Sequence, residues 1–191
     1  MRVVKVDKEI IKKLRESRLS TEMKSLENCD FLIIIEREEK IIAASGIGGL
    51  FHVPSLQIHY DFRKRALGGK LLKETIEESK RRRYSFIAGS RNPENLEAVR
   101  LHDFFEFHTI FQVKYAPNFT RDVVIKTFNR KGKIVSKFLR IFNTLAGTIV
   151  LACILRIIKP FFSNILTLTP EEFPNPNIIY MIKNFKKLKN G

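Results

Sequence analysis

The chain has 191 residues and a formal net charge of +15, and 44% of its residues are apolar. This apolar content excludes a disordered polymer and favours a globular domain with an appended segment. Only two cysteines occur, Cys29 and Cys153, and neither belongs to a metal-binding spacing. A disulfide-rich secreted framework is excluded, and no metal site is expected. The N-terminal sequence MRVVKVDKEIIKKL lacks an apolar signal core, so we expect a cytoplasmic protein.

The charge is unevenly distributed along the chain. Residues 108–191 hold fourteen Lys or Arg against three Asp or Glu, whereas residues 1–107 hold twenty-one against seventeen. We predict a nearly balanced folded domain over residues 1–130 and a basic extension over residues 131–191. The basic extension suggests an anionic partner, either phospholipid or nucleic acid.

The first part of the chain alternates apolar runs with a helical pattern. Residues 2–6 are typical of a strand, and Asp7 is a candidate N-cap for a helix that ends at Arg18. The apolar runs 31–35 and 41–47 flank a charged turn and predict a hairpin.

The next strand, residues 56–60, leads into a cationic turn with two adjacent glycines. The turn opens a helix over residues 68–82, and Arg63 begins the run Arg-Lys-Arg just before it. Backbone N–H groups at a helix N-terminus lack partners within the helix and can bind a phosphate. The glycine spacing fits neither the nucleoside-triphosphate loop nor the dinucleotide fingerprint.

The remaining elements complete an α/β pattern. Residues 84–88 predict a strand, residues 95–105 a helix and residues 123–128 a last strand. The order of strand, helix, three strands, helix, strand and helix predicts an α/β domain with a mixed, mainly antiparallel sheet flanked by helices.

The turn resembles the coenzyme A (CoA) pyrophosphate loop of the GCN5-related N-acetyltransferase (GNAT) superfamily. That loop has the signature [QR]-x-x-G-x-[GA], often after H-P-[DE]-[YF], and residues 59–68 read HYDFRKRALG. Arg63 and Gly68 stand at the expected positions. Tyr60 replaces the proline, and Ala66 replaces the first glycine.

A second block strengthens the resemblance. The family commonly carries N-x-x-A-[IV]-x-L-Y-E-K-x-G-F, and residues 95–107 read NLEAVRLHDFFEF without a gap. Glu106 replaces the glycine that usually closes this helix. The resemblance covers residues 1–115 and implies a GNAT-type sheet.

The resemblance also implies the activity and the residues that bind acetyl-CoA. An amine of unknown identity would attack the thioester of acetyl-CoA directly in a ternary complex. The fourth strand would hold the carbonyl and pantetheine through its backbone, the loop would hold the pyrophosphate, and Asn95 would contact the pantetheine region. The implied residues are Leu56, Gln57, Ile58, Arg63, Lys64, Arg65, Ala66, Leu67, Gly68, Gly69 and Asn95.

The acid and the base are less well defined. His102 stands where many relatives have a tyrosine, and an imidazolium with a pKa of about 6.5 can protonate a thiolate whose thiol has a pKa of about 8.5. The alternative is a polar residue on an amphipathic helix. For the base, His52 and His59 flank the fourth strand. Other candidate acids are Tyr60, Tyr84 and Tyr115.

Two of the departures from the motifs, at Ala66 and Glu106, keep a second function open. If Ala66 adopts a positive φ, backbone strain should weaken CoA binding. Glu106 stands where a left-handed conformation is common. A non-catalytic, membrane-associated CoA-binding module is therefore the alternative to an acetyltransferase.

The extension has helix length from residue 133 to residue 159. Lys133, Lys137 and Arg140 form a basic stripe, and a broad apolar face lies opposite, which is typical of a helix in a membrane interface. The apolar face contains Ile134, Phe138, Ile141, Phe142, Leu145, Ile149, Val150, Cys153 and Ile157.

Other interpretations of the extension remain. The uncharged run 141–155 is shorter than the roughly 20 residues of a membrane-spanning helix. A core or homodimer helix is also compatible with the pattern. A nucleic-acid arm, with an RNA or ribosomal substrate, ranks below membrane contact because few aromatic residues alternate with the lysines. The apolar run 161–168 extends the expected membrane contact to residues 133–168, and residues 178–188 form a cationic amphipathic ending.

Overall fold

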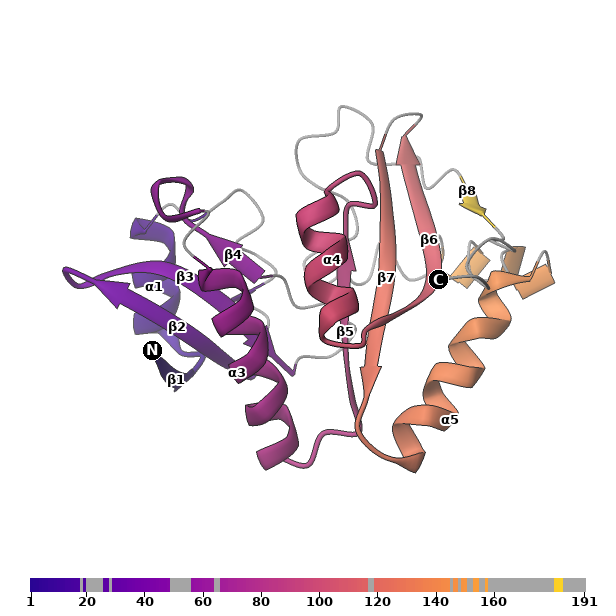
Figure 1. Ribbon diagram of the computed structural model, residues 1–191, viewed down its shortest axis with the longest axis horizontal. Coiled ribbons are helices and arrows are strands. Elements are labelled where there is room, and N and C mark those ends of the chain that lie inside the picture. Colours follow the sequence, from indigo (N-terminus) through magenta and orange to yellow (C-terminus); the bar gives the residue numbers. More distant parts are fainter. Residues whose placement is uncertain are drawn as a thin grey trace. The chain divides into compact units, whose positions relative to one another are not determined.

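The computed structural model describes most of the chain up to residue 144 and shorter pieces after it. The described residues are 1–17, 19, 26–27, 29–48, 56–63, 66–116, 119–144, 146–147, 149–150, 153–154, 157 and 181–183. They belong to two units, Met1–Tyr84 and a second that begins at Ser85 (Figure 1).

The first unit contains a four-stranded antiparallel sheet with the strand order β1-β2-β3-β4. Helix α1 contacts β3, and helix α3 contacts β2, β3 and β4. The elements are β1 (Arg2–Lys5), α1 (Lys8–Glu16), β2 (Phe31–Arg37), β3 (Lys40–Ile47), β4 (Leu56–Ile58), the 3-10 turn η1 (Tyr60–Phe62) and α3 (Leu67–Arg81).

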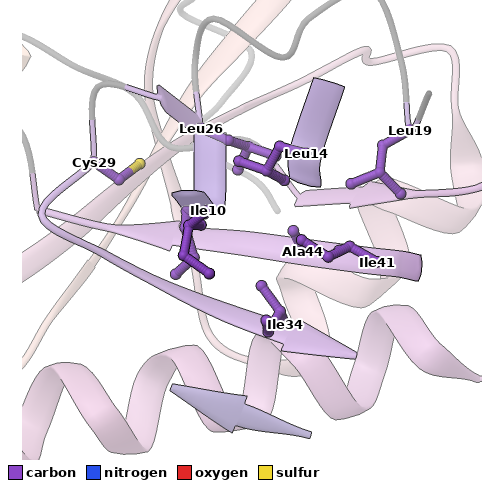
Figure 2. Close-up of a cluster of buried hydrophobic side chains, with 9 residues drawn as sticks. Ile10, Leu14, Leu19, Leu26, Cys29, Ile34, Ile41 and Ala44 are labelled. Atoms are coloured by element: carbon purple, nitrogen blue, oxygen red, sulfur yellow. The ribbon is translucent and has the colours of Figure 1, made fainter. Parts of the chain in front are cut away.

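Strand β2 is buried on both faces. Ile34 belongs to the same buried cluster as Ile10 and Leu14 of α1 (Figure 2). The adjacent Ile33 packs in a different cluster with Leu71 of α3. Because successive side chains of a strand point to opposite faces, a strand covered on both faces has a continuous apolar run rather than an alternating one.

The second unit contains another four-stranded antiparallel sheet, in the order β5-β7-β6-β8. Its buried core includes Phe107, Ile110, Val124 and Ile125. The elements are β5 (Phe86–Arg91), α4 (Leu96–Phe104), β6 (His108–Ala116), β7 (Phe119–Thr127), α5 (Arg130–Leu139), the 3-10 turn η2 (Arg140–Asn143) and β8 (Met181–Lys183).

The predicted α/β architecture with antiparallel pairing is confirmed, but the prediction of one mixed sheet differs from the structure. The described strands form two sheets, and every described pair is antiparallel. Asp7 caps α1 as predicted, because its Oδ1 accepts from the N–H of Ile10 at 2.9 Å. Strand β6 was not predicted.

The prediction of one helix over residues 133–159 is wrong. Helix α5 ends at Leu139, η2 follows, and the backbone of Thr144 is extended with φ −94° and ψ 161°. The Thr144 hydroxyl accepts from the N–H of Gly147 at 3.1 Å, as an N-cap does at the start of a new helical segment. Residues 146–147, 149–150, 153–154 and 157 are helical.

The rest of the predicted extension is described only in part. Strand β8 falls within residues 178–188, where the cationic amphipathic ending was predicted. The run 161–168 lies outside the described residues. Within the part of the chain that the structure describes, no helix has the length and apolar character needed to cross a membrane.

Candidate functional site

The N-terminus of α3 presents backbone donors. Ala66 is the N-cap, with φ 56° and ψ 13°, and no side chain caps the helix there. The N–H of Lys70 donates to the carbonyl of Ala66 at 3.3 Å. The N–H groups of Leu67, Gly68 and Gly69 precede this bond and have no carbonyl four residues earlier within the helix. They form the positive end of the helix dipole, where an anion is favoured.

The turn η1 ends at Arg63, three residues before the N-cap of this helix. The N–H of Phe62 donates to the carbonyl of His59 at 2.9 Å, and that of Arg63 donates to the carbonyl of Tyr60 at 3.3 Å. Arg63 is exposed, and its backbone is extended, which ends the turn three residues before Ala66. The predicted site residues Lys64 and Arg65 lie outside the described residues.

Strand β4 is the edge of its sheet and directs part of its backbone outward. The N–H of His59 donates to the carbonyl of Ile42 at 2.8 Å. Because alternate residues of an antiparallel pair face the partner strand, Gln57 faces β3, and Leu56 and Ile58 direct their N–H and C=O groups to the other edge. Leu56 and Ile58 therefore present backbone groups that a ligand could pair with, and the CoA contacts expected for Leu56, Gln57 and Ile58 remain predictions.

His59 has an acidic neighbour in the same turn. Its Nδ1 lies 3.6 Å from Oδ2 of Asp61, and its ring stacks on Tyr60 with a centroid distance of 4.4 Å. This Nδ1 atom is buried and has no hydrogen-bond partner among the described residues. His59 remains a predicted base, and His52, the other one, lies outside the described residues.

Asn95 and His102 both belong to α4 in the second unit. The Oδ1 atom of Asn95 accepts from the N–H of Ala98 at 3.1 Å, so Asn95 is the N-cap of α4. This explains structurally why an asparagine stands at the start of the second block. Its contact with CoA remains a prediction.

His102 is held in one tautomer by its own helix. Its Nδ1 lies 2.7 Å from the carbonyl oxygen of Ala98, and because a carbonyl only accepts, Nδ1 carries the hydrogen. Burial lowers the pKa of His102 below its usual 6.5. At neutral pH the ring is therefore neutral, and Nε2, on the side of Gly89 of β5, is an acceptor. This state fits a proton acceptor better than the predicted imidazolium donor.

The alternative tyrosine donors differ in their surroundings. The hydroxyl of Tyr84 donates to Oδ2 of Asp30 at 3.2 Å, and burial raises the pKa of Tyr84. Tyr60 is 69% exposed. The side chain of Tyr115 lies outside the described part of the chain.

A buried arginine that the sequence analysis missed holds α4 in place. The guanidinium of Arg91, at the end of β5, donates to Oδ1 of Asp103 at 2.8 Å and to the carbonyl of Val99 at 3.0 Å. It also lies 3.5 Å from Oδ2 of Asp122, which is buried on β7. A weak signal was present, because Asp122 directly precedes the apolar run Val-Val-Ile of β7, and a buried carboxylate requires a partner.

The other end of α4 is fixed by Lys126 of β7. Its Nζ donates to the carbonyl of Phe105 at 2.8 Å and to Glu106 at 3.0 Å. A cation at a helix C-terminus is favourable because the last carbonyls carry the negative end of the dipole. Arg91 and Lys126 together position the helix that carries Asn95 and His102.

The described residues contain no group of three or more His, Cys, Asp or Glu side chains that could hold a metal ion. No protein-family model matches the chain, and no curated protein matches it.

Solved structures do match. The ribosomal-protein-alanine N-acetyltransferase from Brucella melitensis is 12% identical with a TM-score of 0.52, and the match covers 67% of this chain and 100% of that one. The protein YncA from Salmonella typhimurium, solved with acetyl-CoA, is 14% identical with a TM-score of 0.53, over 68% of this chain and 95% of that one. An aminoglycoside 6'-acetyltransferase type Ii is 14% identical with a TM-score of 0.51, over 68% of this chain and 99% of that one.

At such low identities the matches establish the fold alone. Over about two thirds of its length, the chain has the fold of the GNAT acetyltransferases, as its two sequence blocks implied.

Proposed function

We propose that this protein is an N-acetyltransferase that transfers the acetyl group of acetyl-CoA to an amine. The observation that carries the proposal is the arrangement in the first unit: the outward edge of β4 leads through η1 and Arg63 to the N-terminus of α3, which has no side-chain cap. An extended ligand with an anionic pyrophosphate fits this order of backbone donors.

Each part of acetyl-CoA would meet a different group. The pyrophosphate would accept hydrogen bonds from the N–H groups of residues 67–69 and face the charge of Arg63, with Lys64 and Arg65 as further cations. The amide groups of the pantetheine would pair with the outward backbone of Leu56 and Ile58, as a short strand pairs with a sheet edge. Acetyl-CoA supplies the thioester that is attacked.

The reaction needs one proton to leave the amine and one to reach the thiolate. The amine nitrogen forms a bond with the carbonyl carbon, and the carbon–sulfur bond breaks. A neutral His102 can accept a proton at Nε2, and the imidazolium that results can protonate the thiolate. The lowered pKa of His102 makes the imidazolium a stronger acid, so it favours the second of these two proton transfers.

Two measurements test the proposal. Acetyl-CoA should raise the melting temperature of the full chain, and incubation with a panel of amines should release CoA thiol. The panel should include small polyamines, aminoglycosides, peptide N-termini and ribosomal proteins, because the matched acetyltransferases share one fold but are named for different acceptors. No thermal shift with acetyl-CoA or with CoA would contradict the proposal.

The alternative is a CoA-binding module without turnover. The departures from the family motifs at Ala66 and Glu106 keep this alternative open, and the positive φ of Ala66 costs free energy at the proposed pyrophosphate loop under either function. The two functions share the thermal shift but differ in thiol release. If the acceptor is an RNA or a ribosomal component, only ribosomal fractions added to the same panel should stimulate the release of CoA thiol.

A further inference from the structure

Helix α5 packs on its own unit through small residues. The buried positions of the helix are Gly132 and Ser136, and the helix contacts β7 (Figure 1). A Cβ atom at Gly132 would lie 2.0 Å from the carbonyl oxygen of Ser85, so the glycine permits a close backbone approach. Asn129 fixes the start of the helix, because its Oδ1 accepts from the N–H of Gly132 at 3.0 Å.

The large apolar residues of this helix point away from the unit. Ile134 is 59% exposed, Phe138 60% and Ile141 of η2 53%. They are spaced four and three residues apart and therefore share one face. A helix that stabilises its own domain buries its large apolar residues and exposes its small or polar ones. In α5 the small residues are buried and the large apolar residues are exposed, so these three side chains contribute little to the core of their own unit.

Exposed cations flank the same face. Lys133, Lys137 and Arg140 are exposed at positions next to Ile134, Phe138 and Ile141 in the sequence. The sequence contains no Asp or Glu from residue 123 to residue 170. The surface therefore combines exposed hydrocarbon with positive charge.

The helical segment after Thr144 continues this character. Its exposed apolar residues are Ile149, Val150, Ile154 and Ile157, at 59%, 50%, 40% and 65%. Cys153 is also exposed and lies four residues from both Ile149 and Ile157, within the same apolar stripe.

We propose that Ile134, Phe138 and Ile141, with their flanking cations, form a docking surface for an anionic lipid membrane, which we name the α5 face. Hydrocarbon at the centre with cations at the side matches an interface in which acyl chains lie below phosphate groups. The proposal does not depend on the proposed acetyltransferase activity.

Charge disfavours the other occupants. A second copy of the chain would bring the same cations together, and like charges in an interface oppose association. Residues 160–191 hold four Lys against two Glu, so they supply no excess of negative charge either. Nucleic acid would satisfy the cations but leave three large exposed hydrophobic side chains without an apolar partner.

Vesicle binding of the full chain tests the proposal. The protein should cosediment with vesicles of phosphatidylcholine mixed with phosphatidylglycerol and much less with vesicles of phosphatidylcholine alone. Removing two charges with Lys133→Gln and Lys137→Gln should weaken partitioning about fivefold per lysine. Replacing hydrocarbon with Ile134→Gln and Phe138→Gln should weaken it by about tenfold or more.

Matched controls separate this surface from general charge. Lys8→Gln and Lys12→Gln remove two exposed lysines from α1 and should leave partitioning nearly unchanged. Glutamine is a good helix former, and the replaced side chains are exposed, so all variants should fold, which their melting temperatures would verify. Partitioning that falls equally in the α1 variants and in the α5 variants would overturn the proposal.

The native cysteines allow a second, local readout. Burial raises the pKa of the Cys29 thiol to about 12, whereas Cys153 is exposed, so a thiol-reactive environment-sensitive dye should label Cys153. Its emission should shift to the blue only with anionic vesicles. An emission that stays unshifted with anionic vesicles would overturn the proposal. It would also be overturned if the protein did not bind vesicles but formed dimers or nucleic-acid complexes that depend on the α5 face.

Discussion

Ala66 adopts a left-handed backbone conformation at the start of α3, with φ 56°. For a residue with a Cβ atom, this conformation costs about 1–2 kcal/mol. We predict that Ala66→Gly raises the free energy of unfolding by about 1 kcal/mol and tightens CoA binding. Urea denaturation and a CoA titration would measure the two effects.

Glu106 provides a matched control for this prediction. It has φ 58° at the end of α4. Its side chain is 79% exposed, so its ion pair with Lys126 contributes little to the free energy of unfolding. Glu106→Gly should stabilise the chain similarly but leave CoA affinity unchanged. If Ala66→Gly left both stability and affinity unchanged, backbone strain at Ala66 would not limit CoA binding.

His102 gives the proposed activity a defined pH dependence. Burial lowers the pKa of its ring below 6.5, so the neutral form dominates above that value. If the neutral ring accepts the proton of the amine, kcat/KM should rise with pH through a pKa below 6.5 and level off near neutrality. His102→Gln should lower kcat, remove this limb and keep CoA affinity. A rate that falls over the same range would assign the protonated ring as the required form.

The same ring affects stability in a predictable direction. The unfolded chain binds a proton at His102 more readily than the folded chain, so stability decreases as the pH falls from about 6.5 through the lower folded pKa. The His102→Gln variant should lack this part of the acid sensitivity in denaturation curves measured on both sides of that range.

At the scale of elements, Arg91 links α4 to the sheet. Its side chain is 8% exposed and contacts Asp103 of α4 and Asp122 of β7. Arg91→Met would leave Asp122 buried without this cation, and we predict a loss of about 3 kcal/mol in the free energy of unfolding. Urea denaturation measures this loss.

Arg100 serves as the control on α4 itself. It is exposed, so Arg100→Met should change stability by no more than about 0.5 kcal/mol. Equal effects of the two substitutions would show that the Arg91 contacts do not hold the helix.

Gly132 tests the packing of α5. In an ordinary helix, Gly→Ala gains about 1 kcal/mol from propensity. Here the new Cβ would lie 2.0 Å from the carbonyl oxygen of Ser85, and backbone atoms cannot yield as a flexible side chain can. We predict that Gly132→Ala lowers the melting temperature, and a higher value would contradict the close packing described for α5.

Helices and strands whose apolar residues recur with a clear period could be predicted from the sequence. Elements whose position depends on tertiary contacts could not. The helix over residues 68–82 was predicted, and Leu71, Leu72 and Ile76 are buried on one face of α3. Strand β6 had a signal that was missed, because residues 111–115 alternate apolar and polar side chains. The break at Thr144 was not anticipated, because the apolar periodicity continues through it while the backbone changes to an N-cap.

At the scale of the whole molecule, two short sequence blocks predicted the fold, although the matched structures are only 12–14% identical. Asn95 shows one physical reason for such a block, because its side chain caps a helix. The acceptor could not be predicted, because one fold accommodates many acceptors. The neutral state of His102 depends on the burial of its ring, which cannot be predicted from a sequence motif alone.

At the same scale, the proposed function requires that the β4 edge and the α3 N-terminus of this chain bind CoA. Isothermal titration of the full chain with CoA tests it most directly, with Arg63→Glu at the proposed pyrophosphate position and Lys12→Glu as an exposed charge control on α1. We predict saturable one-to-one binding that Arg63→Glu weakens about tenfold or more and that Lys12→Glu leaves nearly unchanged. Absence of binding, or binding that is equally strong in both variants, would show that CoA does not bind at this edge and helix N-terminus.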